Sequence, residues 1–172
     1  MDFTILKDIV LSVGALGGLG LGIYNYLRDK KKDEVDLVVK PLSIHMMGDS
    51  ETYGYNEEKI SASREFKTIG VKVINLSKFD ITISEIGFKI KNDSRGERIA
   101  FPNAMALTGD RNLPARLPSR ESVVIAFNED QLPAEDIRLK IDSVYITTGC
   151  DLFFVGSSGV IEDFKKLEVN YA

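Results

Sequence analysis

The segment IGVKVINLSKFDITISEIGFKI, residues 69–90, decides the fold class of this chain. Ile69, Val71 and Val73 alternate with polar or small residues in its first half, and Phe79, Ile81 and Ile83 do the same in its second. Alternation with a period of two is typical of β-strands that bury one face. Because only a short polar stretch separates the two runs, we predict that they pair as a hairpin.

The alternation changes phase further along the segment. Ile86, Phe88 and Ile90 have the opposite parity to Ile83. A bulge inserts one extra residue and turns the following side chains to the other face of the sheet. We therefore predict a bulge or bend at Ser84–Glu85.

Similar short runs on both sides of this segment predict the remaining strands. The predicted strands are 35–39, 99–101, 122–127, 137–146 and 152–155, with a turn at 148–151. The first run continues past Pro41 to Ile44 and Met46, either as one bent strand or as a second strand. The polar stretch 48–65 is expected to be an exposed loop, and 103–120 to be irregular. Ser157 or Ser158 can cap a final helix in which Ile161, Phe164 and Leu167 share one face.

Seven or eight short strands with turns between them predict a mainly β fold. We expect residues 35–172 to form an antiparallel, Ig-like β-sandwich domain that ends in a short helix. The runs VINLS (73–77), ISEIGF (83–88) and LPSRES (117–122) resemble those of bacterial membrane-tethered β-sandwich proteins. The resemblance implies the same kind of domain attached to a membrane.

A membrane anchor is predicted ahead of this domain. From Ile9 to Leu27 the chain runs 19 residues without a charge, and as a helix these span about 28 Å, close to the thickness of a bilayer core. Residues 1–8 would form an N-terminal tail and 28–34 a basic, charged linker. The alternatives are a cleaved signal peptide and a buried core helix. A signal peptide carries its positive charge before the apolar run, and a core helix has a polar face that this segment lacks.

Basic residues beside the span predict its orientation. Arg28, Lys30, Lys31 and Lys32 follow it, whereas Lys7 alone precedes it closely, so the C-terminal domain is expected to be cytoplasmic. The single cysteine, Cys150, fits a reducing compartment. Asn75-Leu76-Ser77 and Asn92-Asp93-Ser94 match the glycosylation sequon and would then be chance matches.

The predicted span contains a glycine zipper. Gly14, Gly18 and Gly22 recur at intervals of four and lie on one helix face. Small residues at this spacing allow helices to pack closely in lipid. We therefore predict a homo-oligomer formed through the membrane helix, and leave open whether the glycine face packs on itself or on another protein.

Motifs for catalysis, metals or cofactors are not found in the sequence. The net charge is only −4, which gives no indication of DNA or RNA binding. His45 is the only histidine and Cys150 the only cysteine, which leaves no basis for a His-based metal site or a Cys-x-x-Cys pair. We expect His45 to be an ordinary strand residue, Cys150 to be structural, no cofactor to bind, and the protein not to be an enzyme.

One region has an unusual charge. Residues 91–120 hold six basic side chains and three acidic ones, a net charge of +3 in an otherwise acidic domain. Arginine presents a planar charged fork that suits phosphate or carboxylate. Two interpretations stay open. The arginines pair with neighbouring acids, for example Arg98 with Glu97, or they form an anion-binding site. The candidate ligand-binding residues are Arg95, Arg98, Arg111, Arg116 and Arg120.

Two functional hypotheses follow. In the first, the chain is a single-pass, self-associating, non-enzymatic membrane protein whose cytoplasmic domain is an interaction module for another protein. In the second, it is a sensor-effector. Its arginine-rich loops would bind a nucleotide second messenger or another anion, and its helices would then perturb the membrane, an architecture similar to that of bacterial membrane effectors in antiviral (phage) defence.

Overall fold

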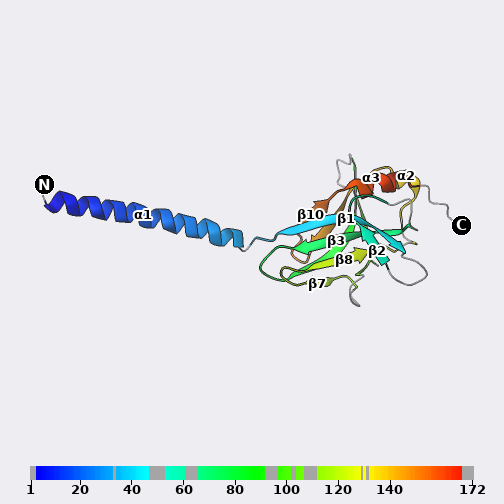
Figure 1. The fold of residues 1–172 in the computed structure, drawn as a ribbon, viewed down its shortest axis with the longest axis horizontal. Coiled ribbons are helices and arrows are strands. Elements are labelled where there is room, and N and C mark those ends of the chain that lie inside the picture. The colour runs from blue at the N-terminus through cyan, green and yellow to red at the C-terminus, as the bar shows by residue number, and fades with distance from the viewer. Residues whose placement is uncertain are drawn as a thin grey trace. The chain divides into compact units, whose positions relative to one another are not determined.

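The computed structural model describes residues 3–32, 34–46, 53–60, 66–91, 97–101, 104–106, 112–128, 130 and 132–167. The chain divides into two compact units, Met1–Val35 and Asp36–Ala172. The first contains one helix, α1 (Phe3–Lys32), and the second is mainly β with antiparallel sheets (Figure 1). The predicted mainly β class and the presence of an N-terminal helix are confirmed.

Helix α1 is longer than the predicted span. It begins at Phe3, inside the predicted tail, and continues through the basic residues to Lys32. Among the residues that the structure describes, no helix is long and apolar enough to span a membrane. The predicted span begins at Ile9, and the side chains of Ile9 and Val10 lie outside the described ones.

The side chains of α1 that are described, from Leu11 to Asp29, are all exposed. Apart from the adjacent residues and the nearby backbone of α1 itself, no described atom lies within 4 Å of the position that a Cβ would take at Gly14, Gly18 or Gly22. The predicted glycine face is therefore open in the single chain.

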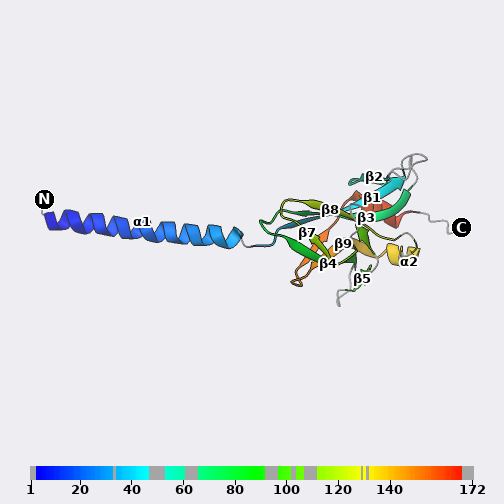
Figure 2. The ribbon, with the colours of Figure 1, turned by 90° about the horizontal axis from the view of Figure 1, so that it is seen from below.

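Two antiparallel sheets make up the β unit (Figures 1 and 2). The first has the order β2 (Tyr53–Asn56), β1 (Leu37–Met46), β3 (Phe66–Asn75), β8 (Ser122–Ala126), β6 (Met105–Ala106). The second has the order β10 (Phe153–Gly156), β9 (Ile141–Thr148), β4 (Ile81–Ile90), β5 (Arg98–Ala100), and β7 (Ala115–Leu117) also pairs with β4. Both β5 and β7 are short strands that pair with β4, at Gly87–Lys89 and at Ile81–Ile83.

The predicted hairpin of residues 69–83 is wrong. β3 pairs with β1 and β8 in one sheet, whereas β4 pairs with β9, β5 and β7 in the other, so residues 76–80 carry the chain from sheet to sheet. The alternating pattern identifies which face of a strand is buried, and it does not identify the partner strand. Two consecutive strands with good alternation can therefore belong to different sheets.

Two local predictions within the strands hold. The register of β4 against β9 shifts between Ile83 and Glu85, which confirms the bulge. Residues 37–46 form one strand through Pro41, with a register shift at Ile44/His45. β2 pairs only with the Ser43–Met46 part of β1. No described strand pairs with this edge of β1 at Pro41, the kind of position where a strand tolerates proline.

Other expected elements differ. β2 lies inside the predicted loop 48–65, and β6 and β7 lie inside the predicted irregular stretch 103–120. The first part of the predicted strand 137–146 is instead the short helix α2 (Glu135–Arg138), with two acidic residues in its first turn, where the helix dipole favours them. The apolar residues Ile137, Leu139 and Ile141 imitate strand alternation, although only Ile141 begins β9.

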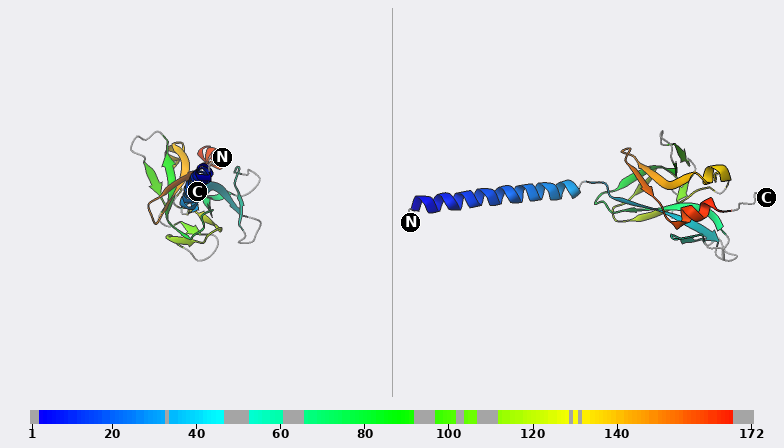
Figure 3. Two further views of the ribbon diagram at one scale, coloured as in Figure 1. Left: turned by 90° about the vertical axis from the view of Figure 1, so that its left-hand side faces the viewer. Right: turned by 90° about the horizontal axis from the view of Figure 1, so that it is seen from above.

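The final helix is confirmed as α3 (Gly159–Lys165), and the Ser158 Oγ accepts a hydrogen bond from the Val160 N–H at 3.3 Å. α3 packs against β1 and β9 (Figure 3). Its Phe164 ring stacks on Phe88 of β4 at 5.7 Å between centroids, and Phe88 also contacts Phe127, which follows β8, at 4.8 Å. The aromatic core therefore joins α3 to strands of both sheets.

Candidate functional site

The structure does not bring the described arginines of residues 91–120 to one place. Arg98 lies on β5 opposite Lys89, and Arg116 lies on β7 opposite Thr82. These positions on β4 are seven residues apart (89 − 82), or about 23 Å at 3.3 Å per residue. Arg95 and Arg111 lie outside the described residues. Arg98 and Arg116 are thus parts of two different surfaces.

Arg116 is paired with an acid. Its Nη2 lies 2.7 Å from Asp80 Oδ2, and its Nε donates to the same oxygen at 2.9 Å. The Ser119 N–H donates to the other carboxylate oxygen at 3.0 Å. The Ser119 N–H and the Arg116 guanidinium together lower the pKa of Asp80. Arg116 therefore fits the first of the two interpretations, ordinary pairing with a neighbouring acid.

The backbone of Arg120 has a structural role. It adopts a positive φ of 64° in the turn after Ser119, and its N–H donates to the Asn75 carbonyl at 3.0 Å. Its side chain is exposed. This turn and the 76–80 connection are thereby held together.

Arg98 has a different environment. Its guanidinium lies over two aromatic rings, 5.6 Å from the centroid of Tyr145 and 5.2 Å from that of Phe153. These two rings stack on each other at 5.1 Å. The Tyr145 hydroxyl donates to Glu85 Oε1 at 2.7 Å. We call Arg98, Tyr145, Phe153 and Glu85 the Arg98 platform.

Burial and hydrogen bonding fix the platform. Burial, with the bond to Glu85, raises the pKa of Tyr145, so its hydroxyl stays a hydrogen-bond donor at physiological pH. Phe153 is exposed on the edge strand β10. The guanidinium is planar and carries its N–H groups in one plane, and its cation–π contacts with the two rings favour one position of the group. The platform can therefore present an oriented cation beside an exposed aromatic ring.

Gly87 makes room for this arrangement. It lies opposite Tyr145 on β9 and opposite Ala100 on β5. A Cβ at Gly87 would lie 2.7 Å from Cε1 of Tyr145 and would overlap the Ile99 carbonyl oxygen. Only glycine allows both the ring and the β5 backbone to approach β4 this closely.

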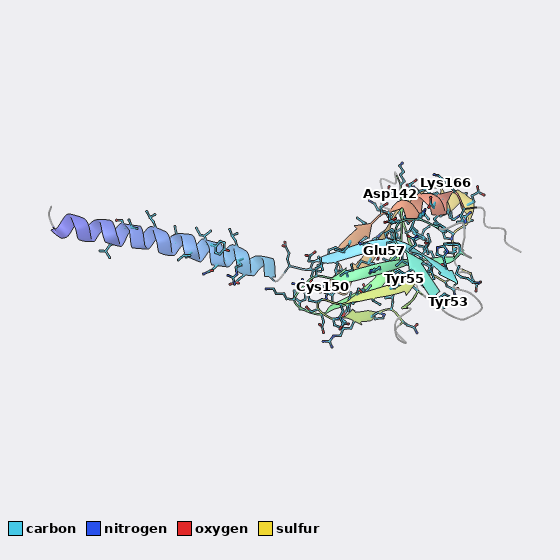
Figure 4. All side chains as sticks on the ribbon, viewed as in Figure 1. Tyr53, Tyr55, Glu57, Asp142, Cys150 and Lys166 are labelled. Atoms are coloured by element: carbon cyan, nitrogen blue, oxygen red, sulfur yellow. The ribbon has the colours of Figure 1, made fainter. Side chains whose placement is uncertain are left out.

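The exposed face of the first sheet carries a second charged group, labelled in part in Figure 4. Lys72 Nζ and Lys40 Nζ lie 2.6 and 3.0 Å from the Glu57 carboxylate, and Lys72 Nζ lies 5.8 Å from the Tyr55 ring centroid. Hydrogen bonds from Lys72 and then Lys40 lower the pKa of Glu57, and the bond to Glu57 raises the pKa of Lys72. Because these shifts keep Glu57 and Lys72 charged at neutral pH, the two groups are not suited to general acid–base chemistry there.

The histidine and the cysteine differ in their surroundings, and only His45 has the structural environment expected from the sequence. His45 is buried on β1, with Nε2 2.9 Å from Ser43 Oγ, which itself donates to the Lys59 carbonyl. Cys150 is exposed in the turn between β9 and β10. Among the described residues, no three or more His, Cys, Asp or Glu side chains are grouped so that they could hold a metal ion.

Sequence reasoning selected Arg98 as a candidate and missed the other members of the platform. Tyr145, Phe153 and Glu85 lie on three other strands, and no local pattern links them to Arg98. The one available signal was Gly87, an isolated glycine within a strand pattern, which indicates a close approach of another group. No protein-family model, curated protein or solved structure with which the chain was compared matches it.

Proposed function

We propose that this chain is a single-pass, self-associating, non-enzymatic membrane protein whose β unit is an interaction module. The observation that carries the proposal is the exposure of the apolar side chains of α1. Leu11 and Leu16 are 60% and 70% exposed, and Val13, Leu19, Leu21 and Ile23 are similarly open. Each such side chain gains about 1.5–3 kcal/mol on burial, so a helix of this composition is stabilised by lipid or by a partner helix. Because the sequence from Ile9 to Leu27 carries no charge, we propose lipid as the main surroundings of this helix.

The β unit is proposed to be an Ig-like antiparallel β-sandwich on the cytoplasmic side. The aromatic contacts of Phe88 and Phe127 between the two sheets support the sandwich. The basic residues Arg28, Lys30, Lys31 and Lys32 support the orientation. Asn75 is buried with its side-chain amide fully engaged, so the Asn75-Leu76-Ser77 sequon offers no accessible acceptor in the folded unit.

Topology fusions test the location. We expect alkaline phosphatase fused after Ala172 to be inactive and a fluorescent protein at the same point to be bright, because the basic cluster keeps the C terminus in the cytoplasm. As a matched control, Arg28, Lys30, Lys31 and Lys32 are changed together to Gln, which should reduce the orientation preference while the apolar span is retained. An active phosphatase fusion to the unaltered chain would rule out the cytoplasmic assignment.

A second candidate function is that of a sensor-effector with an anionic, nucleotide-like ligand, and the Arg98 platform favours it. Arg98 offers charge and Phe153 offers a stacking face, the two features that a nucleotide or another aromatic anion would use. Arg116, which is paired with Asp80, is a weaker candidate.

An arginine-to-lysine change tests this candidate. Nucleoside monophosphates, cyclic nucleotides and inorganic phosphate would be titrated into the full chain in detergent micelles by calorimetry. Arg98→Lys keeps the charge and loses the planar fork, and because a hydrogen bond to a charged group is worth about 1.5–3 kcal/mol, binding should weaken about ten- to a hundredfold. The matched control Arg116→Lys should leave binding unchanged. If none of these probes binds at sub-millimolar concentration, the sensor function fails.

A further inference from the structure

We infer that one end of the β unit is a membrane-contact surface that binds uncharged as well as anionic lipid headgroups. We call it the entry end, made of the 76–80 connection, the turn 118–121 and the turn 149–152. The inference rests on the proposed membrane anchor and adds to it a specific surface of the β unit.

Hydrogen bonds join the 76–80 connection to Asp36, where the unit begins, and join the other two loops to the adjoining ends of β3 and β4. The Leu76 N–H donates to the Asp36 carbonyl at 2.9 Å, and the Asp36 N–H donates to Ser77 Oγ at 2.8 Å. The Gly149 N–H donates to the Thr82 carbonyl at 2.8 Å, which places the 149–152 turn at the start of β4. Figure 4 shows Cys150 of this turn at the opposite end of the β unit from Tyr53.

The entry end exposes large apolar side chains. Leu76 and Phe79 are 37% and 38% exposed, and Leu152 is 43% exposed. Connections between strands are ordinarily rich in small and polar residues, whereas two of these loops present three large apolar side chains at one end. They suit the interfacial layer of a bilayer, where side chains insert only partway.

The charged side chains of the entry end sum to a net charge of −1 and form no basic patch. Lys78 and Arg120 are basic, Arg116 is paired with Asp80, and Asp36, Glu121 and Asp151 are acidic. Attraction to an anionic membrane is therefore not what would bring this surface to lipid. The apolar side chains carry the contact, and the basic ones can extend along it to phosphate.

The short connection to α1 restricts the distance between this end and the membrane surface. If the membrane span ends at Leu27, the part of α1 from there to Lys32 is about 7.5 Å long, comparable to the thickness of the headgroup layer. Four residue steps then lead from Lys32 to Asp36, and an extended chain covers at most about 3.6 Å per step, roughly 14 Å in all. An anchor at Ile9–Leu27 therefore holds Asp36, and the 76–80 connection bonded to it, near the headgroups.

Single-tryptophan variants test the inference, because the chain contains no tryptophan. The full chain would be reconstituted into phosphatidylcholine vesicles that carry a nitroxide on the headgroup. We expect the emission of Phe79→Trp and of Leu152→Trp to be quenched several-fold more strongly than that of Leu139→Trp. Leu139 is a matched control, 58% exposed and two residues before Ile141, which pairs with Ile90 at the far end of β4. Two reporter positions are used so that the test can still be read if one of the two variants fails to fold.

A fourth variant separates the inference from the anchor on which it rests. Leu19→Trp should be quenched by a nitroxide on the acyl chain, and if it is not, the proposed anchor fails. If Leu19→Trp is quenched while Phe79→Trp and Leu152→Trp are quenched no more than Leu139→Trp, the entry end does not contact lipid. A blue-shifted but unquenched Phe79→Trp would show that protein, such as a second copy, covers this end, and would also overturn the inference. Added phosphatidylglycerol should change the quenching little, and a strong dependence on it would contradict an apolar contact.

Discussion

Replacing Asn75 by alanine is expected to lower the free energy of unfolding of the β unit by about 3 kcal/mol or more. The side chain is fully buried, and its Nδ2 donates to the carbonyls of Phe79, Leu117 and Pro118 at 2.9, 3.2 and 3.1 Å. Its Oδ1 accepts from the Ser77 N–H at 2.9 Å. Alanine would leave these groups without their partner, and each buried polar group that loses its hydrogen bond costs about 1–3 kcal/mol.

Denaturant unfolding of the full chain in detergent, followed by circular dichroism of the β unit, measures this effect. The matched control Leu76→Ala alters a neighbouring, part-exposed side chain and should change stability by far less. Asn75→Asp should also destabilise the unit, because it keeps an acceptor for Ser77 but directs a second oxygen at three carbonyls. If Asn75→Ala is as stable as the unaltered chain, this side chain does not hold the 76–80 connection in place.

Changing Gly14, Gly18 and Gly22 together to Leu is expected to reduce self-association several-fold in a membrane two-hybrid assay. Leucine keeps the helix apolar, and its bulk prevents the close backbone approach that small residues allow in lipid. Each of these glycines has open space around it in the single chain, so the substitution adds no clash within the protomer.

Gly20→Leu is the matched control for this test. Position 20 lies two residues from Gly18, about 200° around the helix, and therefore on a different face. Its substitution should leave association unchanged. If the triple variant associates as well as the unaltered chain, either the β unit holds the oligomer or the glycine face contacts lipid.

Local patterns predicted the elements that contain a clear apolar run or a regular apolar spacing. β4 with its bulge, β8 and the Ser158-capped α3 all follow from apolar spacing and capping residues. β2 was not predictable in this way, because Tyr53 and Tyr55 are exposed and the strand buries little. α2 was missed because a single turn contains too few apolar residues to distinguish a helical period from a strand period.

Pairing between distant strands could not be predicted, and the candidate site depends on it. The hairpin prediction failed because the 76–80 connection changes sheets through the hydrogen bonds of Asn75, which leave no sign in hydrophobic periodicity. For the same reason, charge composition directed attention to Arg98 but gave no sign of Tyr145 and Phe153. These two residues come next to Arg98 only through the pairing of β4 with β5 and β9, and of β9 with β10.

The bonds between Asp36 and the 76–80 connection also determine how mechanical force enters the β unit. A pull on the chain ahead of Asp36 first loads its bonds to Leu76 and Ser77, and then acts along β1. β1 is paired with β3 from Leu37 to His45, through antiparallel ladder bonds that run perpendicular to the strand. Tension along β1 therefore shears many of these bonds at the same time and does not open them one by one. Such a geometry lets the unit bear load at its attachment point without unravelling from its N-terminal end.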